Sequence, residues 1–227
     1  MEHRPFTWLG ALPVPEHVLT AGLVAALLVT FAAVVHGRLA TAEPAIPPEE
    51  GVTARNIAEV FVESMLGLAE GVIGHSAERY VPLLGSFFIF ILVANLIGLV
   101  PGFTPPTSDF NITFGLGVVS FVAYHVSGAR EHGLGYAKQF LGSVVFLAPL
   151  MLVVELFSHL FRPVSLGIRL FANMFADHQV VEIFTGLTKL GVPVVFYVLG
   201  AFVAVVQAFV FTMLSAIYIA LAVSHEH

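Results

Sequence analysis

The chain has 227 residues, of which 58% are hydrophobic and 11% are charged, and its mean hydropathy is +0.94. One water-soluble core cannot bury this much apolar surface, so the composition predicts an integral membrane protein. With 9 Lys and Arg, a net charge of -6 and no Cys, the sequence excludes a basic nucleic-acid-binding surface, disulfides and cysteine metal sites. The apolar residues form long runs rather than short alternating segments, which predicts an all-α polytopic fold.

The first apolar run, residues 18–35, predicts a transmembrane helix, although it is just under the ~20 residues that a span needs. The small residues at 40–42 resemble a signal-peptide cleavage site, which is the alternative interpretation. Arg4 is opposed by Glu2 and Glu16, however, and the run exceeds a usual signal core. A retained transmembrane helix is therefore the favoured prediction.

A connector and an amphipathic helix are expected next. Residues 41–51 are rich in proline and acidic side chains, which predicts a connector outside the membrane. Residues 52–75 place polar and apolar side chains at the helical period, with Glu63 on one face and Val60 on the other. This pattern predicts a helix lying on the membrane surface. Because the polar face of this helix is rich in carboxylates, contact with lipid and contact with a partner subunit remain alternatives.

The rest of the chain predicts a helical hairpin and a long apolar region. Two apolar runs flank a proline-rich turn and predict a hairpin over residues 81–127. Residues 138–225 are then apolar almost without pause. A single helix over 139–187 would be ~75 Å long, more than twice the ~30 Å thickness of the hydrocarbon layer. We therefore expect this stretch either to break near Pro163 into two spans or to lie strongly tilted.

The distribution of Lys and Arg predicts an external N-terminus and a cytoplasmic C-terminus. With this orientation only Arg4 and Lys189 fall outside, and the turn of the hairpin carries no positive charge. The other basic residues of the predicted loops and the surface helix fall on the cytoplasmic side: Arg38, Arg55, Arg79, Arg130 and Lys138.

The segment "RPVSLGIRLFANMF" places Arg169 in a run of large apolar side chains. A charge in the bilayer centre costs roughly 2.5 to 17 kcal/mol, so it normally faces a polar path or a counter-charge. We therefore expect a functional site at Arg169, with snorkelling or a static ion pair to Glu155 or Asp177 as the alternatives. At about 100° per residue, one helix face carries Arg169 together with Glu155, Ser158, Arg162, Ser165 and Asn173.

Other ionisable residues accompany this face. His178 and Glu182 are four residues apart and lie nearly opposite it, with Asp177 between the two faces. They fall short of the three protein ligands usual in a catalytic zinc site, so no metal site is predicted. Glu155 and His159 form a similar pair.

The last apolar segment carries a narrow polar stripe of Gln207, Ser215 and Tyr218. Hydrogen bonding between helices and a water-filled path explain this stripe equally well.

At these residues the chain resembles subunit a of the rotary ATP synthases, the stator half of a membrane proton channel. "RPVSLGIRLFANMFADH" is similar to the signature around the family's essential arginine, "NLIGLVPGFTPPTSDFNITFGLGV" to its hairpin, and "QAFVFTMLSAIYIALA" to its last helix. The resemblance implies one membrane domain over residues 1–227: a transmembrane helix, a surface helix, a hairpin and two long tilted helices. It implies a bacterial plasma membrane location, no cofactor, and as partners a c-subunit ring, peripheral-stalk b subunits and other ATP synthase subunits.

The resemblance also implies roles for individual residues. Arg169 matches the essential arginine opposite the ring carboxylates. Where some relatives carry an ionisable group seven residues before the glutamine, this chain has Gly200, and Asp177 or Glu182 is expected to supply that group. The other residues expected on the proton path are Glu155, Asn173, His178, Gln207 and Tyr218.

The implied function is coupling of proton flow to ring rotation and ATP synthesis through two aqueous half-channels, with no bond chemistry on nucleotide by this chain. The competing hypothesis is a self-contained proton-coupled transporter in which Arg169 clamps a substrate carboxylate. Such transporters often contain internal repeats, and "PVSLGIRL" has no second copy here. An intramembrane metal hydrolase is a weaker alternative.

Overall fold

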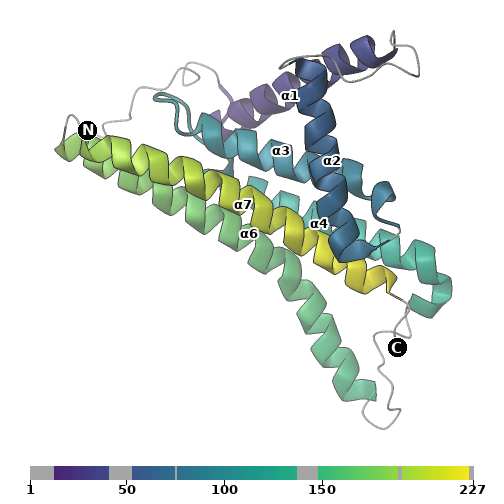
Figure 1. Ribbon diagram of the computed structural model, residues 1–227. Helices are drawn as coiled ribbons and strands as arrows, with labels where there is room; N and C mark the ends of the chain where they lie inside the picture. The colour runs from purple at the N-terminus through teal and green to yellow at the C-terminus, as the bar shows by residue number, and fades with distance from the viewer. Residues whose placement is uncertain (1–12, 41–52, 75, 137–147, 189–190, 225–227) are drawn as a thin grey trace.

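The computed structural model describes residues 13–40, 53–74, 76–136, 148–188 and 191–224 (Figure 1). Within these ranges the regular elements are all helical, which confirms the all-α prediction. In the described part of the chain, four helices are long and apolar enough to cross a membrane, namely α1, α4, α6 and α7, whereas the apolar α3 has 17 residues. The α-helices are α1 (Glu16–Ala40), α2 (Ala54–Ile73), α3 (Val81–Ile97), α4 (Phe110–His132), α6 (Ala148–Leu187) and α7 (Val192–Val223).

The core of the molecule is a bundle of α3, α4, α6 and α7, in which α7 packs against the other three (Figure 1). Lipid is as apolar as the side chains inside this bundle, so close packing and hydrogen bonds, rather than exclusion of water, must hold the helices together. Buried side chains from three of the helices meet in one cluster: Phe87, Ile91, Leu166, Leu170, Met174, Ala208 and Phe211.

Two glycines let α4 and α6 approach to backbone contact. A β-carbon added at Gly117 would stand 2.5 Å from the carbonyl oxygen of Pro163. A β-carbon added at Gly167 would stand 3.0 Å from the Cα atom of Phe114. Small residues at such positions allow membrane helices to pack more closely than larger side chains permit.

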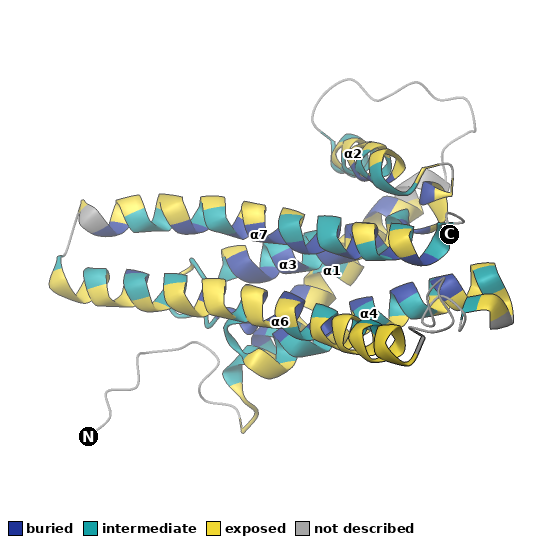
Figure 2. Cartoon of the chain, turned by 90° about the horizontal axis from the view of Figure 1, so that it is seen from below, coloured by how far each residue is buried: buried dark blue, intermediate teal, exposed yellow. Residues whose placement is uncertain are grey.

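Helix α6 is continuous over 40 residues and contains Pro163 in its interior. Of the two alternatives for this stretch, the break at the proline therefore does not occur, and one long helix is formed. Proline cannot donate the backbone hydrogen bond to the carbonyl four residues earlier, which bends a helix without ending it. Figure 1 shows α6 bending so that its first part leaves the bundle, and most residues of 150–161 are exposed (Figure 2). At ~1.5 Å per residue, the helix is about 60 Å long, well above the ~30 Å thickness of the hydrocarbon layer. It therefore lies tilted or extends beyond that layer.

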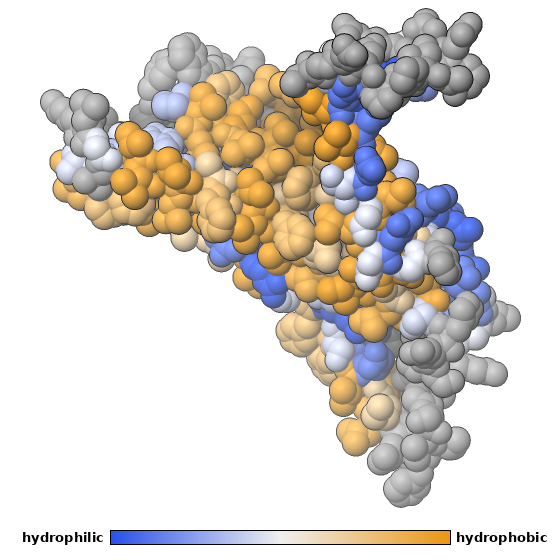
Figure 3. Space-filling view, in the orientation of Figure 1, coloured by the Kyte–Doolittle hydropathy of each residue, from blue (hydrophilic) through white to orange (hydrophobic). Residues whose placement is uncertain are grey.

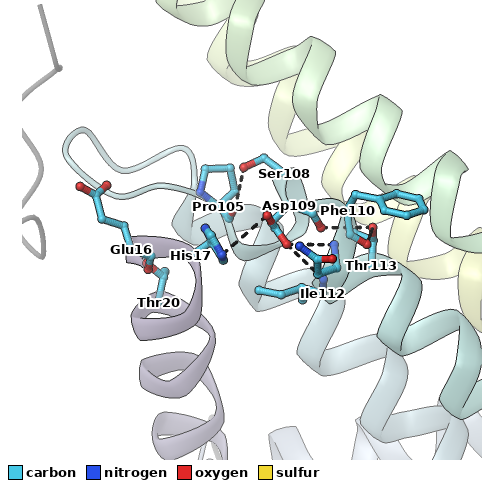
Figure 4. A network of polar contacts seen from close by, with 10 residues as sticks. Glu16, His17, Thr20, Pro105, Ser108, Asp109, Phe110, Ile112 and Thr113 are labelled. Atoms are coloured by element: carbon cyan, nitrogen blue, oxygen red, sulfur yellow. Dashed lines mark hydrogen bonds and ion pairs between the residues drawn. The ribbon is translucent and has the colours of Figure 1, made fainter. Parts of the chain in front are cut away.

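Helix α1 is anchored to the bundle at its N-terminal end. The Nε2 atom of His17 lies 3.6 Å from Oδ2 of Asp109, whose other carboxylate oxygen caps the N-terminus of α4 (Figure 4). The hydroxyl of Thr104 donates a hydrogen bond of 3.1 Å to Oε2 of Glu16. Most side chains farther along α1 are exposed, so these polar contacts fix one end of the helix and leave its length to face lipid.

Helix α2 crosses α3 and α7 at a steep angle on the outside of the bundle (Figures 1 and 2). Its bounds, Ala54–Ile73, fall within the range 52–75 predicted for a surface helix, of which residues 52 and 75 lie outside the described ranges. Thr53 caps its N-terminus through the N–H of Asn56. Figure 3 shows that the face seen in this view is mainly apolar, with hydrophilic residues near α2 and near the lower edge of the bundle.

The hairpin is longer than predicted, because α4 continues to His132 rather than ending near residue 127. Polar residues of the last turn do not interrupt a helix, and Arg130 suits the negative end of the helix dipole. Gly133, with φ of 54°, then ends the helix. The connector 41–51, the first ten residues of the predicted stretch 138–225, and the orientation markers Arg4, Lys138 and Lys189 lie outside the described residues.

Candidate functional site

Arg169 projects away from the bundle core. Its neighbours Leu166 and Leu170 are 2% and 0% exposed, whereas Arg169 belongs to the exposed class. Within the described part of the chain, its guanidinium makes neither an ion pair nor a hydrogen bond. The alternative of a static ion pair with Glu155 or Asp177 is therefore wrong for the structure described. The helix presents a permanent positive charge on an outer face.

The polar face predicted around Arg169 exists and is turned outward. Ser158, Ser165 and Asn173 are exposed like Arg169, while Glu155 and Arg162 are half-buried. Bare polar groups are costly in lipid, so such a stripe requires water or a polar partner against it. The face is suited to contact with another subunit.

Asn173 and Gln207 connect this stripe to α7. Nδ2 of Asn173 donates a hydrogen bond of 2.7 Å to Oε1 of Gln207, which is 3% exposed. The Nε2 atom of Gln207 is buried and has no hydrogen-bond partner among the described residues. Farther along the same helix, the hydroxyls of Ser215 and Ser120 lie 2.8 Å apart. The predicted stripe on the last helix thus makes hydrogen bonds between helices at two of its positions.

A small pocket lies between the end of α3, the turn of the hairpin and α6, and Asp177 and His178 both line it. Asn95 lines the same pocket and is 2% exposed. Its Oδ1 atom accepts a hydrogen bond of 2.6 Å from Thr107, whereas its buried Nδ2 atom has no hydrogen-bond partner in the described ranges. This pocket thus combines a buried amide donor with a carboxylate and an imidazole near the end of α6.

Asn95 and Thr107 were missed by the sequence analysis. The one available signal was an amide inside the apolar run "ILVANLIGLV", since a polar side chain buried in a membrane bundle usually has a partner. Thr107 lies in the proline-rich turn, and nothing in the local pattern marks it as that partner.

Asp177 occupies the space beside Gly200. A β-carbon on this glycine would stand 2.6 Å from Oδ2 of Asp177. Of the two residues expected to supply an ionisable group near Gly200, Asp177 therefore has the required position. Glu182 is exposed and does not line the pocket that holds Asp177 and His178.

A second polar cluster lies toward the other end of α6. Nε2 of His159 is 3.1 Å from Oε1 of Glu155, and Nδ1 of His159 is 3.0 Å from the hydroxyl of Tyr124. The guanidinium of Arg162 lies over the rings of Tyr124 and Tyr218, at 5.9 and 5.2 Å from their centroids. The structure thus brings Glu155 and Tyr218 into one cluster, which also contains Tyr124, a residue that the sequence analysis did not select.

The expected site residues fall at three levels along α6. At ~1.5 Å per residue, Glu155 precedes Arg169 by about 21 Å, and Asp177 follows Arg169 by about 12 Å. Arg169 therefore lies between two separate polar clusters. No group of three His, Asp or Glu that could hold a metal ion occurs among the residues the structure describes.

The chain as a whole is similar to known proteins of one family. The family model described as ATP synthase A chain matches residues 18–220. The chain is 46% identical to ATP synthase subunit a of Bdellovibrio bacteriovorus, over 98% of this chain and 99% of that protein. It is 41% identical to ATP synthase subunit a of Solibacter usitatus, over 96% and 91% of the two chains. It is 40% identical to ATP synthase subunit a 2 of Syntrophotalea carbinolica, over 93% and 87%.

Proposed function

The chain belongs to the ATP synthase A chain family, and from this premise we propose that it is the proton-translocating stator subunit of a rotary ATP synthase. Family membership makes it a membrane-sector subunit of an F-type ATP synthase, whose other subunits are its partners. The proposal adds that Arg169 faces the carboxylates of a c-subunit ring, that two half-channels lead to it, and that peripheral-stalk b subunits hold the chain. The observation that carries it is an exposed Arg169 that has no counter-charge among the described residues and lies between two polar clusters.

The proposed mechanism is electrostatic. A ring carboxylate can lose its proton inside the membrane only if a positive charge lies opposite, because an isolated charge in lipid is strongly unfavourable. The guanidinium of Arg169 supplies that charge and never donates its own proton. It also blocks a direct proton path between the two half-channels. The membrane potential contributes ~2.3 kcal/mol per charge per 100 mV.

We assign the first half-channel to the pocket of Asp177 and His178. The amide donors of Asn95 and Gln207 are buried without protein partners in the described ranges, and such groups in native proteins are normally paired with water. Asn173 connects this route to the level of Arg169 through its hydrogen bond to Gln207. In this proposal Glu182, which is exposed, attracts protons at the outer side of the route.

We assign the second half-channel to the cluster of Glu155 and Tyr218. Glu155 is partly exposed, with 35% of its side-chain surface accessible, and can exchange protons with water. With the N-terminus outside, this end of α6 faces the cytoplasm. The ion pair between Arg79 and Glu131, whose side-chain atoms lie 4.0 Å apart, supports placing the start of α3 and the end of α4 on the same side of the membrane. The distribution of basic residues predicts the same placement.

Crosslinking to the ring tests the proposal. The chain contains no Cys, so Ile168→Cys, at a position 47% exposed beside Arg169, introduces a single thiol. Paired with a Cys near the ring carboxylate, it should form a disulfide that stops both ATP synthesis and ATP-driven proton pumping, and reduction should restore both. The matched control is Leu170→Cys, which is 0% exposed and faces the bundle core.

The transporter hypothesis predicts a different result. If the purified chain moves a solute into liposomes without any ring protein, and Ile168→Cys does not crosslink to the ring in the whole complex, the stator assignment fails.

A further inference from the structure

The imidazole of His159 has both ring nitrogens in hydrogen-bonding contact with ionisable side chains. Nε2 lies 3.1 Å from a carboxylate oxygen of Glu155, and Nδ1 lies 3.0 Å from the hydroxyl of Tyr124. An ionised carboxylate only accepts hydrogen bonds, so Nε2 carries the proton when Glu155 is charged. In a neutral imidazole Nδ1 is then an acceptor, and Tyr124 donates to it. The two neighbours thus determine the tautomer of His159.

The setting of His159 is intermediate between bulk water and the closed core. Its side chain is 12% exposed, that of Glu155 is 35% exposed, and Tyr124 is 1% exposed. The three residues therefore form a hydrogen-bonded chain from a buried hydroxyl on α4 to a carboxylate that water can reach. Within a membrane-spanning segment, such a chain of ionisable groups is a common form of proton relay.

We infer that His159 carries protons in the half-channel that ends at Glu155, with Tyr124 as the residue that positions its imidazole. This inference rests on the proposed function. A proton that arrives at Nδ1 of His159 allows the proton on Nε2 to pass to the carboxylate of Glu155. The imidazole is left neutral in its other tautomer, and Glu155 becomes a neutral acid that releases the proton to water. Rotation of the imidazole, which turns its protonated nitrogen toward Glu155 and its unprotonated nitrogen toward the Tyr124 hydroxyl, restores the starting hydrogen bonds without moving a proton backwards.

The charged and titratable groups around His159 come from three helices and the segment after α4. Glu155 favours a proton on His159, whereas the guanidinium of Arg162, held over Tyr124 and Tyr218, opposes a second positive charge. A proton is therefore held only transiently. The ring of His125 lies 5.2 Å from that of His159, but its Nδ1 atom contacts the backbone carbonyl of Phe121 at 3.1 Å. Tyr136 contacts His125, and burial raises the pKa of Tyr136, so it stays neutral.

The test is proton flux through the whole complex in membrane vesicles at constant proton-motive force. We expect His159→Gln, which keeps hydrogen bonding but cannot carry a proton, to lower the flux about tenfold or more. Wild-type flux should depend on the pH on the Glu155 side through protonation of the His159 imidazole, and His159→Gln should lack that part of the dependence. Tyr124→Phe keeps the ring under Arg162 and should shift the pH profile, because the tautomer is no longer determined.

Added imidazole should restore flux in His159→Ala, which a purely structural role would not allow. The matched control is His125→Gln, which should keep the wild-type pH profile because His125 is bound to the backbone. Wild-type flux and an unchanged pH profile in His159→Gln would overturn the inference while leaving the stator function intact. If His159→Gln does not assemble, an unchanged profile in Tyr124→Phe overturns it instead. Failure of the proposed function is distinct, because the wild-type complex would then show no ring-dependent flux.

Discussion

The carboxylate of Asp177 on α6 lies directly against Gly200 on α7, where a β-carbon would stand 2.6 Å from Oδ2. In the proposed function, Asp177 takes the place of the ionisable group that the family resemblance implies near this position of the last helix. The absence of a side chain at residue 200 makes room for it. The arrangement keeps an ionisable group beside His178 while changing the helix that supplies it.

Replacing this glycine should displace Asp177. Gly200→Ala introduces a contact well below the van der Waals distance, so we expect the carboxylate to move and ATP synthesis to fall severalfold, with destabilisation of about 1–3 kcal/mol. Synthesis in membrane vesicles and thermal unfolding of the complex measure the two effects. Gly186→Ala is the control, because no atom lies within 4 Å of the added β-carbon there. Equal effects at both glycines would show that the contact with Asp177 is unimportant.

Loss of the charge at Arg169 should abolish proton-driven ATP synthesis. We expect Arg169→Ala to assemble, because the side chain is exposed and has neither a hydrogen bond nor an ion pair among the described residues, and we expect it to permit passive proton leak. Arg169→Lys should also fail, since a compact ammonium whose pKa shifts readily cannot replace a guanidinium that is always charged. ATP synthesis and proton leak in membrane vesicles are the measurements. Ile168→Val is the control, and near-normal synthesis in Arg169→Ala would contradict the assignment.

Water access to the first half-channel should be measurable with thiol reagents. Single Cys replacements of His178, Glu182 and Gln207 should react with a water-soluble reagent, because the thiolate that reacts forms in contact with water. The rates should follow exposure, with Glu182→Cys fastest and Gln207→Cys slowest of the three. Ile183 is apolar and 55% exposed in the isolated chain, and we expect this side chain to face lipid, so Ile183→Cys should react least. Equal protection at all four positions would favour plain hydrogen bonding between helices.

The backbone contact between α4 and α6 should tolerate no added side chain. Gly117→Ala places a methyl group 2.5 Å from the carbonyl oxygen of Pro163, so the helices must separate. We expect a loss of about 1–3 kcal/mol in stability and less assembled complex, measured by thermal unfolding in detergent and by the amount of complex in membranes. Gly115→Ala on the same helix meets no atom within 4 Å and should be near neutral. A stable Gly117→Ala chain would show that the contact is looser than described.

The sequence predicted those features whose signal is local. The energetic cost of a charged side chain in lipid identified Arg169 as a candidate site without any tertiary information. The helical period placed the surrounding polar residues on one face. The polar pairs were not predictable in this way, since Tyr124 and His159 are 35 residues apart and Asn95 and Thr107 are 12 apart. Their pairing depends on how α4, α6 and the turn pack together. The length of α4 was underestimated because polar residues in its last turn lower hydropathy without weakening a helix.

The contact of Gly117 with the backbone at Pro163 also has a mechanical consequence. Side chains yield under force by changing rotamer, but two touching backbones have no such freedom and resist compression directly. The middle of α6, six residues before Arg169, is therefore braced against α4 along a stiff line. In the proposed mechanism, a rotor that turns against Arg169 exerts a sideways load on α6. The backbone contact with α4 would transmit that load to the hairpin, so we expect the charge to keep its position under torque.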